Sequence, residues 1–455
     1  MFKGKKILVV GLARSGMAAV KALHKRGAVL FAYDAKTEKE LPAEAAWLKD
    51  LGVKIFLGTY PPLHQGIDLL VVSPGVPLDI DPVQEAYRRG IRVIGELELA
   101  FLLKSPQVEM LAVTGTNGKT TTTALLEMIL KTDGRNAAAA GNIGVPLCSL
   151  IEEMESGYIA VEASSFQLES TQSFNPHVAG ILNITPDHLD RHKSMQGYIQ
   201  AKRNIFKNHT AADYLILNYD DEIVRNLALS ANSQVIFFSV EQELAEGFYI
   251  AEQSIQVNWG GEHCSLLSLP EIRLRGKHNL ENILCAAAMA WADGVSPASI
   301  ISSLRNFGGV RHRLEEVTIH NNILYINDSK GTNPESTMKA LQAFDDPIVL
   351  IAGGRSKGGS FTALAELIPG KVKELVLLGE AREQIKSAVM ELGYRNIHEV
   401  EDFPAAVYLA QRLAEPGDVV LLSPACASWD MFPSYEHRGD LFCELVGQLV
   451  NETFA

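Results

Sequence analysis

A glycine-rich segment with a single lysine follows a short apolar run that ends at Val113. Its residues, in order, are Gly115, Thr116, Asn117, Gly118, Lys119, Thr120 and Thr121. Glycines let a backbone wrap phosphate oxygens, the lysine reaches the β- and γ-phosphates, and a hydroxyl such as that of Thr120 can ligate Mg²⁺. Val113 stands where the general phosphate-binding motif has its first glycine. The segment nevertheless lies between a predicted strand and a helical pattern at 124–131, and this context indicates nucleotide-phosphate binding.

Acidic and imidazole side chains follow two later apolar runs. Glu162 ends the run 158–161, and the segment 183–190 follows another run. A carboxylate at Glu162 can hold a Mg²⁺ whose other ligands are a hydroxyl and phosphate oxygens, although helix capping would also explain it. Parallel strands end at one edge of a sheet, so we expect these segments to share one site. The second segment contains Asp187, His188 and Asp190, which could form a metal or acid–base cluster or merely cap a helix.

A second glycine-containing turn lies near the N-terminus. Positions 11–16 read Gly-Leu-Ala-Arg-Ser-Gly, and Asp34 ends the next apolar run. This approximates a dinucleotide-binding fingerprint, but Ala13 replaces the middle glycine. We therefore interpret the turn as a place where a nucleotide diphosphate meets a helix N-terminus, near Ser15 and Gly16. The residues that either line the same pocket or form a plain turn are Ser73, Pro74 and Gly75.

Cationic and hydroxyl side chains follow three apolar runs in the last third of the chain. The segments are 327–333, 353–358 and 423–430. Solvated loop lysines are one interpretation of them. The other is a cationic pocket for a substrate that bears carboxylates. Its candidate residues are Lys330, Thr332, Arg355, Lys357 and Ser423.

Short continuous apolar runs predict the elements that position these segments. The runs are 7–10, 69–72, 111–113, 158–161, 181–184, 323–326, 348–351, 375–378 and 419–422. Continuous runs, as opposed to alternating ones, are typical of strands buried on both faces of a mostly parallel sheet. Helical patterns between them, including one at 96–103, predict an α/β protein.

Two interruptions suggest three domains. A proline follows the helical pattern 96–103, and glycines end another helical pattern before a basic cluster at 311–313. We predict domains at 1–105, 106–309 and 310–455, in line with the chain length. Residues 234–275 predict a β-rich addition to the central domain.

The composition limits the classes of function. The 455 residues carry 41 Lys and Arg against 54 Asp and Glu, a formal charge of −13, and 47% are hydrophobic. An acidic globular chain is a poor general nucleic-acid binder. No apolar run reaches the roughly 18 residues of a membrane helix. Five cysteines without a CxxC pair favour a reducing compartment, so we expect a cytoplasmic protein.

Several blocks together resemble the Mur ligase family, the ATP-dependent peptide synthetases of bacterial cell-wall assembly. The shared blocks are GTNGKTT at 115–121, EASSFQLE at 162–169, NITPDHLDRH at 183–192, GxHNxxN at 276–282 and HRLE at 312–315. Two narrower blocks, NDSKGTN at 327–333 and SPACASWDMF at 423–432, are similar to the branch that joins D-glutamate to UDP-N-acetylmuramoyl-L-alanine. The Asp-Asn-Pro-Arg motif of the ligases that add a diamino acid is absent, which favours the same branch.

The resemblance implies a Rossmann-like domain for the UDP-sugar, a P-loop-type domain for ATP and Mg²⁺, and a Rossmann-like domain for D-glutamate, in a monomer. The implied ATP-binding residues are those of 115–121 together with Asn282, Arg313 and Asp328. The implied metal ligands are Thr120, Glu162, His188 and, if carbamylated, Lys202; the implied catalytic residues are Lys119, His188 and Lys202. The implied UDP-sugar contacts are Ser15, Gly16, Asp34, Ser73, Pro74, Gly75, Asn142 and His188, and the D-glutamate contacts are Lys330, Thr332, Lys357, Ser423 and Phe432.

Three alternatives remain open from the sequence. The first is another member of the superfamily, such as a folylpolyglutamate synthetase, against which the two narrower blocks weigh. The second is a redox enzyme built on the N-terminal turn, disfavoured by Ala13. The third is a nucleotide-gated interaction module that makes no product. We predict a ligase that forms an acyl phosphate.

Overall fold

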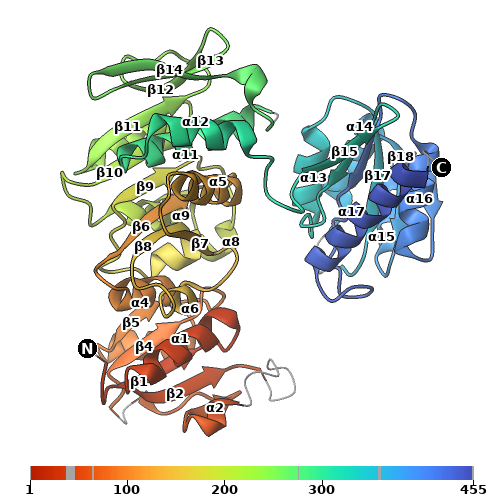
Figure 1. Ribbon diagram of the computed structural model, residues 1–455. Helices are drawn as coiled ribbons and strands as arrows, with labels where there is room; N and C mark the ends of the chain where they lie inside the picture. Colours follow the sequence, from red (N-terminus) through yellow and green to blue (C-terminus); the bar gives the residue numbers. More distant parts are fainter. Residues whose placement is uncertain (1, 37–46, 64–65, 275, 357–359, 453–455) are drawn as a thin grey trace. The chain divides into compact units, whose positions relative to one another are not determined.

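The computed structural model describes residues 2–36, 47–63, 66–274, 276–356 and 360–452. Contacts divide the chain into two compact units, residues 1–307 and 308–455, here called unit 1 and unit 2. Each unit is α/β, with helices packed on predominantly parallel sheets (Figure 1). The predicted fold class is therefore confirmed.

The first sheet of unit 1 is parallel, with the strand order β3-β2-β1-β4-β5. Its strands are β1 (Lys6–Val10), β2 (Val29–Asp34), β3 (Lys54–Leu57), β4 (Leu69–Val72) and β5 (Arg92–Gly95), and its helices are α1 (Arg14–Lys25), α2 (Trp47–Asp50), α3 (Asp81–Arg88) and α4 (Glu96–Leu103). Val10 at the end of β1 lies in register with Tyr33 of β2 and Val72 of β4. The turns after these three strands consequently meet at one edge, where the strand order reverses, and such a switch point is a common ligand site.

The second sheet of unit 1 has nine strands in the order β14-β13-β12-β11-β10-β9-β6-β8-β7. These are β6 (Val108–Thr114), β7 (Ala137–Gly141), β8 (Gly157–Glu162), β9 (Val178–Ile181), β10 (Tyr214–Asn218), β11 (Gln234–Ser239), β12 (Gly247–Ala251), β13 (Ser254–Trp259) and β14 (Glu262–Ser268). The helices are α5 (Lys119–Thr132), α6 (Leu147–Leu150), α7 (Ser165–Glu169), α8 (Leu189–His192), α9 (Met195–Arg203), α10 (Glu222–Asn226), α11 (Lys277–Ala292) and α12 (Pro297–Asn306). The strands from β7 to β12 run parallel, and β12, β13 and β14 form an antiparallel meander, which accounts for the predicted β-rich addition.

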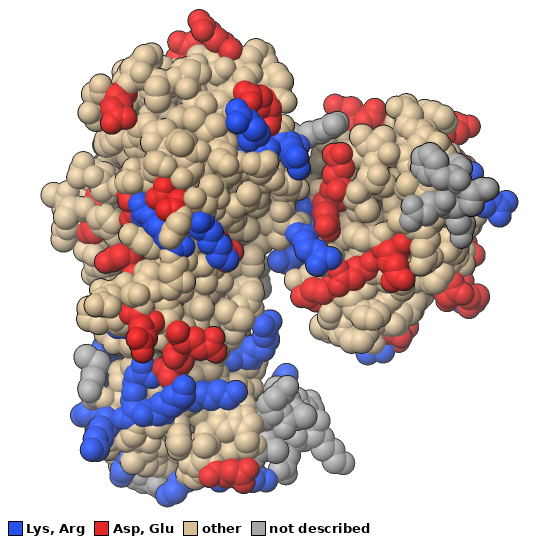
Figure 2. Space-filling view, in the orientation of Figure 1, with Lys and Arg blue, Asp and Glu red and all other residues tan. Residues whose placement is uncertain are grey.

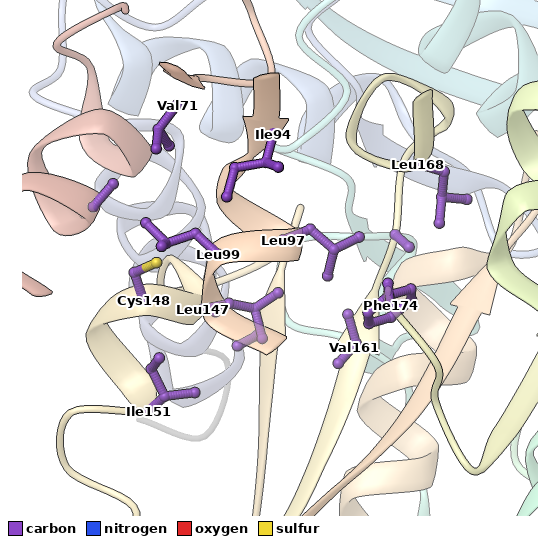
Figure 3. Packing of buried hydrophobic residues seen from close by; sticks show 14 of the residues in the cluster. Val71, Ile94, Leu97, Leu99, Leu147, Cys148, Ile151, Val161, Leu168 and Phe174 are labelled. Carbon is purple, nitrogen blue, oxygen red and sulfur yellow. The ribbon is translucent and has the colours of Figure 1, made fainter. Parts of the chain in front are cut away.

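One hydrophobic core joins the two sheets of unit 1. Helix α4 inserts Leu97 and Leu99 between Ile94 of the first sheet and a group of side chains around the second, which includes Leu147 of α6 and Phe174 (Figure 3). All five side chains are fully or almost fully buried. A predicted boundary at residue 105 lies between α4 and β6, inside unit 1, and the three-domain division stays a prediction.

Glu96 makes the stability of this junction depend on pH. Its Oε1 accepts the backbone N–H of Cys148 at 2.6 Å, whereas its buried Oε2 has no hydrogen-bond partner among the described residues. Burial raises the pKa of Glu96 to about 7, although the bonds to Cys148 lower it.

We expect the free energy of unfolding to fall as pH rises from about 4.5 to 7, because the folded chain retains a proton there that the unfolded chain has lost. The loss is on the order of 3 kcal/mol. Glu96→Gln should remove this part of the pH dependence, measured by denaturant unfolding at pH 5 and pH 8. Parallel pH profiles for wild type and variant would contradict the assignment.

Unit 2 contains one sheet with the order β15-β16-β20-β17-β18-β19. Its strands are β15 (Glu315–His320), β16 (Ile323–Asn327), β17 (Ile348–Gly353), β18 (Val372–Leu378), β19 (Ile397–Glu399) and β20 (Val419–Leu422), and its helices are α13 (Pro334–Gln342), α14 (Thr362–Lys371), α15 (Arg382–Glu391), α16 (Phe403–Leu413) and α17 (Tyr435–Glu452). Only the β15–β16 pair is antiparallel. Leu422 of β20 lies in register with Asn327 and Ile351, so the segments after these three strands meet.

The predicted strands and helices agree with the structure at most positions, and the helix at 96–103 is α4. The strand predicted at 181–184 is wrong in its bounds, because β9 is Val178–Ile181. Beyond Ile181 the backbone bonds to other segments: the Asn183 carbonyl accepts the Thr116 N–H, and the Ile184 N–H donates to Asp221. These bonds pull residues 183 and 184 away from the ladder.

The surface charge is uneven even though the whole chain is acidic. Basic side chains gather over the first sheet on the visible face of unit 1, next to a group of acidic ones (Figure 2). The net charge of −13 therefore says little about any one site. Among the helices in the described part of the chain, none combines the length and apolarity that a membrane span requires.

Candidate functional site

The loop between β6 and α5 leaves backbone N–H groups open at a helix N-terminus. Gly118, the residue before α5, has a left-handed φ of +84°, and no side chain caps the helix. A Cβ atom on Gly118 would come within 2.0 Å of Oδ1 of Asn282 on α11. Glycine is therefore required, and Asn282 lies directly against the loop. Thr120 and Thr121 are buried in the first turn of α5.

Two lysine ammonium groups converge on this loop. Nζ of Lys119 donates to the carbonyls of Gly115 and Thr116, each at 2.9 Å, and Nζ of Lys202 donates to the Gly115 carbonyl at 2.6 Å. Lys202, on α9, is only 1% exposed and lies over the Tyr198 ring. Burial, followed by the charge of Lys119, holds the pKa of Lys202 well below its usual value. A lowered pKa increases the fraction of neutral amine, which is the form of a lysine that can add carbon dioxide.

The segment after β9 braces the phosphate loop. Oδ1 of Asn183 accepts the Asn117 N–H at 2.8 Å, and the Thr116 hydroxyl lies 3.2 Å from the Tyr198 hydroxyl. The Thr185 N–H also donates to the Thr116 hydroxyl, at 3.0 Å. The loops after β6 and β9 are therefore one hydrogen-bonded structure, as the strand-end argument predicted.

Glu162 offers one carboxylate oxygen to a cation. The Asn142 amide donates to Oε1 at 2.9 Å, and Oε2 is buried without a hydrogen-bond partner among the described residues. An unpartnered buried carboxylate oxygen fits Mg²⁺, a hard ion that prefers oxygen ligands. The described residues contain no group of three or more His, Cys, Asp and Glu arranged for a metal, so phosphate and hydroxyl oxygens would have to complete such a site.

His188 stands at the start of α8 with a left-handed φ of +51°. Its side chain is 50% exposed, Nε2 lies 3.5 Å from Oδ2 of Asp187, and its ring centroid is 4.9 Å from that of Phe166. An exposed imidazole beside a carboxylate is accessible to a ligand. The side chain of Asp190 lies outside the described residues.

The N-terminal turn has the tight geometry expected of a diphosphate site. A Cβ atom on Gly16 would lie 1.8 Å from the Gly11 carbonyl oxygen, and no side chain caps α1, so its first N–H groups, from Ser15 onward, stay open. Asp34 accepts the Leu12 N–H at 2.7 Å and thus also braces the turn. The Ser73 hydroxyl donates to the Gly11 carbonyl at 2.8 Å, which brings Ser73, Pro74 and Gly75 to this edge of the sheet.

In unit 2, Asp328 links the two blocks that follow β16 and β20. Its Oδ2 accepts the Ser423 hydroxyl at 2.7 Å, and its Oδ1 accepts the Leu314 N–H at 3.3 Å. Burial raises the pKa of Asp328 to about 6, although Ser423 and the charge of Arg313 lower it. A Cβ atom on Gly331 would lie 2.5 Å from Asp328 Oδ2, so this turn also requires glycine.

The predicted amino-acid-binding residues are only partly accessible. Lys330 and Thr332 lie on the same turn, with Nζ of Lys330 5.8 Å from the centre of the Tyr435 ring. Arg355 is paired with Glu380. The Ser423 hydroxyl is engaged by Asp328, and the Phe432 ring packs on Phe403 in the core. Lys357 lies outside the described residues.

Comparison with known proteins identifies the family. The chain is 47% identical over 448 residues to a protein of Pelotomaculum thermopropionicum named UDP-N-acetylmuramoylalanine--D-glutamate ligase, covering 98% of each. The chain belongs to the Mur ligase family. A relative of the same name from Clostridioides difficile is 45% identical, covering 98% of this chain and 99% of the relative.

Three family models match successive parts of the chain: a Mur ligase MurD-like N-terminal domain at 5–95, a Mur ligase middle domain at 113–290 and a Mur ligase glutamate ligase domain at 312–426. Solved Mur ligases share the fold. The UDP-N-acetylmuramate-alanine ligase MurC of Thermotoga maritima has a TM-score of 0.57 at 22% identity, covering 97% of this chain and 99% of that one. A pseudomurein peptide ligase of Methanothermus fervidus has a TM-score of 0.53 at 19% identity, with 98% and 100% covered.

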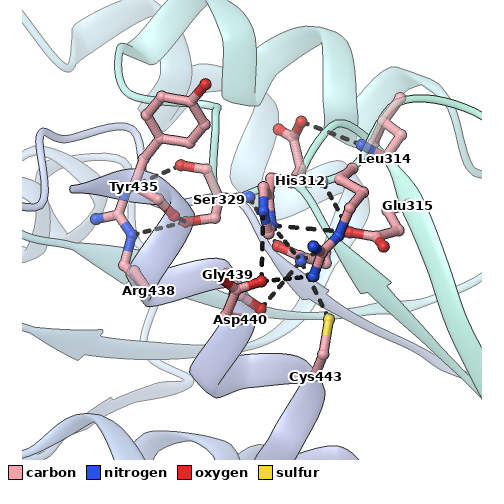
Figure 4. Close-up of polar contacts among 12 residues, drawn as sticks. His312, Leu314, Glu315, Ser329, Tyr435, Arg438, Gly439, Asp440 and Cys443 are labelled. Atoms are coloured by element: carbon pink, nitrogen blue, oxygen red, sulfur yellow. Dashed lines mark hydrogen bonds and ion pairs between the residues drawn. The ribbon is translucent and has the colours of Figure 1, made fainter.

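A cluster of polar residues between α17 and the segment after β16 of this Mur ligase was not predicted from the sequence. Arg438 is fully buried, donating from Nε to the Ser329 hydroxyl at 3.0 Å and from Nη2 to the Ser329 carbonyl at 2.9 Å (Figure 4). The Asn327 amide donates to the carbonyl of Gly439, also on α17, at 3.2 Å. These contacts fasten the 327–333 segment to α17. In the sequence, Arg438 and Gly439 look like ordinary exposed helix positions, so no local pattern indicated that Arg438 is buried.

Proposed function

We propose that the chain joins D-glutamate to UDP-N-acetylmuramoyl-L-alanine, with ATP converted to ADP and phosphate. The convergence of Lys119 and Lys202 on the Gly115 carbonyl, beside a helix N-terminus without a side-chain cap, carries the ATP-dependent part of this proposal. The amino-acid specificity rests on the names of the relatives and on the two narrower blocks at 327–333 and 423–432.

The reaction has two balanced steps. First, the alanyl carboxylate attacks the γ-phosphorus of ATP, forming an acyl phosphate while the bond to ADP breaks. Second, the D-glutamate amine attacks the acyl carbon, an amide bond forms, and phosphate and a proton leave. Lys119 and the open N–H groups of α5 stabilise the negative charge that gathers on the phosphoryl oxygens.

Mg²⁺ would be held by Thr120, Glu162, carbamylated Lys202 and His188, and when bound it neutralises phosphate charge. Glu162 meanwhile orients Asn142 through their hydrogen bond, so a substrate contact and a metal ligand are set by one pair of residues. Within unit 2, Lys330, Thr332 and Lys357 would supply cations and a hydroxyl for D-glutamate. Ser423 supports this site through Asp328.

We assign the UDP-sugar to residues 1–105, ATP to 106–309 and D-glutamate to 310–455, and we expect a cytoplasmic monomer. The deciding experiment measures phosphate release with ATP, UDP-N-acetylmuramoyl-L-alanine and a panel of amino acids. We expect D-glutamate to be the one amino acid of the panel that supports turnover. Equal turnover with L-glutamate or with a diamino acid would overturn the specificity, and ATP binding without any product would leave a nucleotide-gated module as the better explanation.

A further inference from the structure

One arginine of unit 1 bridges its two sheets at the edge where their loops lie. Arg191, on α8, donates from Nη2 to the carbonyl of Pro74 at 3.1 Å and to that of Val76 at 2.9 Å. Both carbonyls belong to the loop after β4, more than a hundred positions earlier in the chain. A guanidinium with fixed donors suits two neighbouring carbonyls better than a lysine ammonium does.

The same guanidinium is held from its own side. Its central carbon lies 4.0 Å from the centre of the Phe166 ring, in the first turn of α7, and stacking of this kind orients the planar group. The next residue, His192, is anchored on α7 as well, because Nε2 lies 2.9 Å from the Ser165 hydroxyl and Nδ1 lies 2.7 Å from Oε1 of Glu169. Helix α8 is thus fixed to α7, which follows β8 of the second sheet, and contacts the loop after β4 of the first sheet through Arg191.

The loop that Arg191 holds packs directly on the N-terminal glycine turn. The Ser73 hydroxyl donates to the Gly11 carbonyl, and a Cβ atom on Gly11 would lie 2.7 Å from Cγ2 of Val76. A shift of the carbonyls of Pro74 and Val76 would therefore open or close the turn that is proposed to receive the diphosphate. A second link from this segment, Lys193 with Asp79 at 3.7 Å, is exposed on both sides and contributes little.

His188 lies three positions before Arg191, at the start of the same short helix. One short helix therefore carries an exposed imidazole at its start and, one turn later, a guanidinium that contacts the loop at 73–76. We propose that Arg191 is a positioning residue for the nucleotide-sugar substrate, holding the 73–76 loop so that the UDP end is bound at a fixed distance from the segment of His188. This inference rests on the proposed function, because it takes the UDP-sugar as the ligand of the first sheet.

The test compares Arg191→Met, which keeps an apolar stem and removes the donors, with Arg191→Gln. Binding of UDP, of UDP-N-acetylmuramoyl-L-alanine and of ATP is measured by calorimetry, and ligation kinetics are recorded. We expect Kd and KM for the UDP ligands to rise about tenfold in the Met variant, as for the loss of one or two hydrogen bonds. Kd for ATP should stay within about twofold, and kcat should change less than KM.

The matched control is Arg225→Met. Arg225 also stacks on an aromatic ring, that of Tyr219, and donates to a backbone carbonyl in unit 1, but its partners lie away from the 73–76 loop. Its UDP binding should equal that of the wild type. Wild-type UDP binding in the folded Met variant, or in the Gln variant if the Met variant does not fold, would overturn the proposal. An equal loss of ATP binding would overturn it too.

The UDP arm separates this inference from the proposed function. If the wild type binds UDP and Arg191→Met weakens that binding, but no amino acid is ligated, then the ligase assignment fails while the role of Arg191 stands. If the wild type ligates D-glutamate and the Met variant binds UDP normally, the ligase assignment stands while the role of Arg191 fails. Absence of UDP binding by the wild type would overturn the inference directly.

Discussion

Lys119→Ala should abolish ligation while leaving UDP-sugar binding intact. The lysine ammonium donates to two carbonyls of the phosphate loop, and we propose that it stabilises the oxygens that gain charge during phosphoryl transfer. Loss of one such preorganised cation lowers kcat by a factor on the order of 10³. The measurement is phosphate release for kcat and calorimetry for the UDP-sugar, whose Kd should change less than about twofold because its proposed site lies on the other sheet.

The matched control for Lys119 is Lys131→Ala on the same helix. Lys131 is largely exposed and, among the described residues, forms an ion pair with Glu127 alone, an interaction of small energy. Its kcat should equal that of the wild type. A simultaneous loss of ATP and UDP-sugar binding in the folded Lys119 variant would contradict the division of ligands between the two sheets.

Lys202→Ala should also lose ligation, and a short-chain carboxylic acid should restore part of it. The truncation leaves space beside the Gly115 carbonyl, where a small carboxylate can stand in for the carbamate that we expect on Lys202. Burial and the charge of Lys119 lower the pKa of Lys202, which increases the fraction of the neutral amine that carbamylation needs. The measurement is kcat as a function of added formate or acetate at constant ionic strength.

Lys207→Ala is the control for rescue. Burial also lowers the pKa of Lys207, which donates to the Thr171 carbonyl, yet this lysine lies away from the phosphate loop. Carboxylic acids should have no effect on this variant. A folded Lys202→Ala protein whose activity no carboxylic acid restores, together with a wild type insensitive to removal of bicarbonate, would count against carbamylation.

The strand ends could be predicted because they depend on local patterns. Continuous apolar runs place buried parallel strands, and parallel strands put Thr114, Glu162 and Ile181 at one edge whatever the details of packing. The bounds of β9 were harder to predict, because they depend on hydrogen bonds with Thr116 and Asp221 that no local sequence pattern indicates. The family resemblance and the fold class are both confirmed, whereas the individual site residues remain predictions.

Burial of charged groups could not be predicted from the residues alone. By its own pattern Lys202 is an exposed helical lysine, and only the approach of Tyr198 and Gly115 in space makes it buried. The burial of Arg438 could not be predicted for the same reason, because its partners on the Ser329 turn lie more than a hundred positions away. The polar groups that matter most here are those whose surroundings come from distant parts of the chain.

The two sheets of unit 1 share one core, so the parts proposed to bind the UDP-sugar and ATP are not separate folding units. A cut at residue 105 would divide the proposed UDP-sugar and ATP modules, yet it would leave Leu97 and Leu99 facing water on one fragment and Phe174 on the other. Exposing each leucine to water costs about 2 kcal/mol of hydrophobic stabilisation. Exchange of the N-terminal module between relatives would therefore have to carry the matching surface of the second sheet with it, so these two modules are constrained to evolve as a pair.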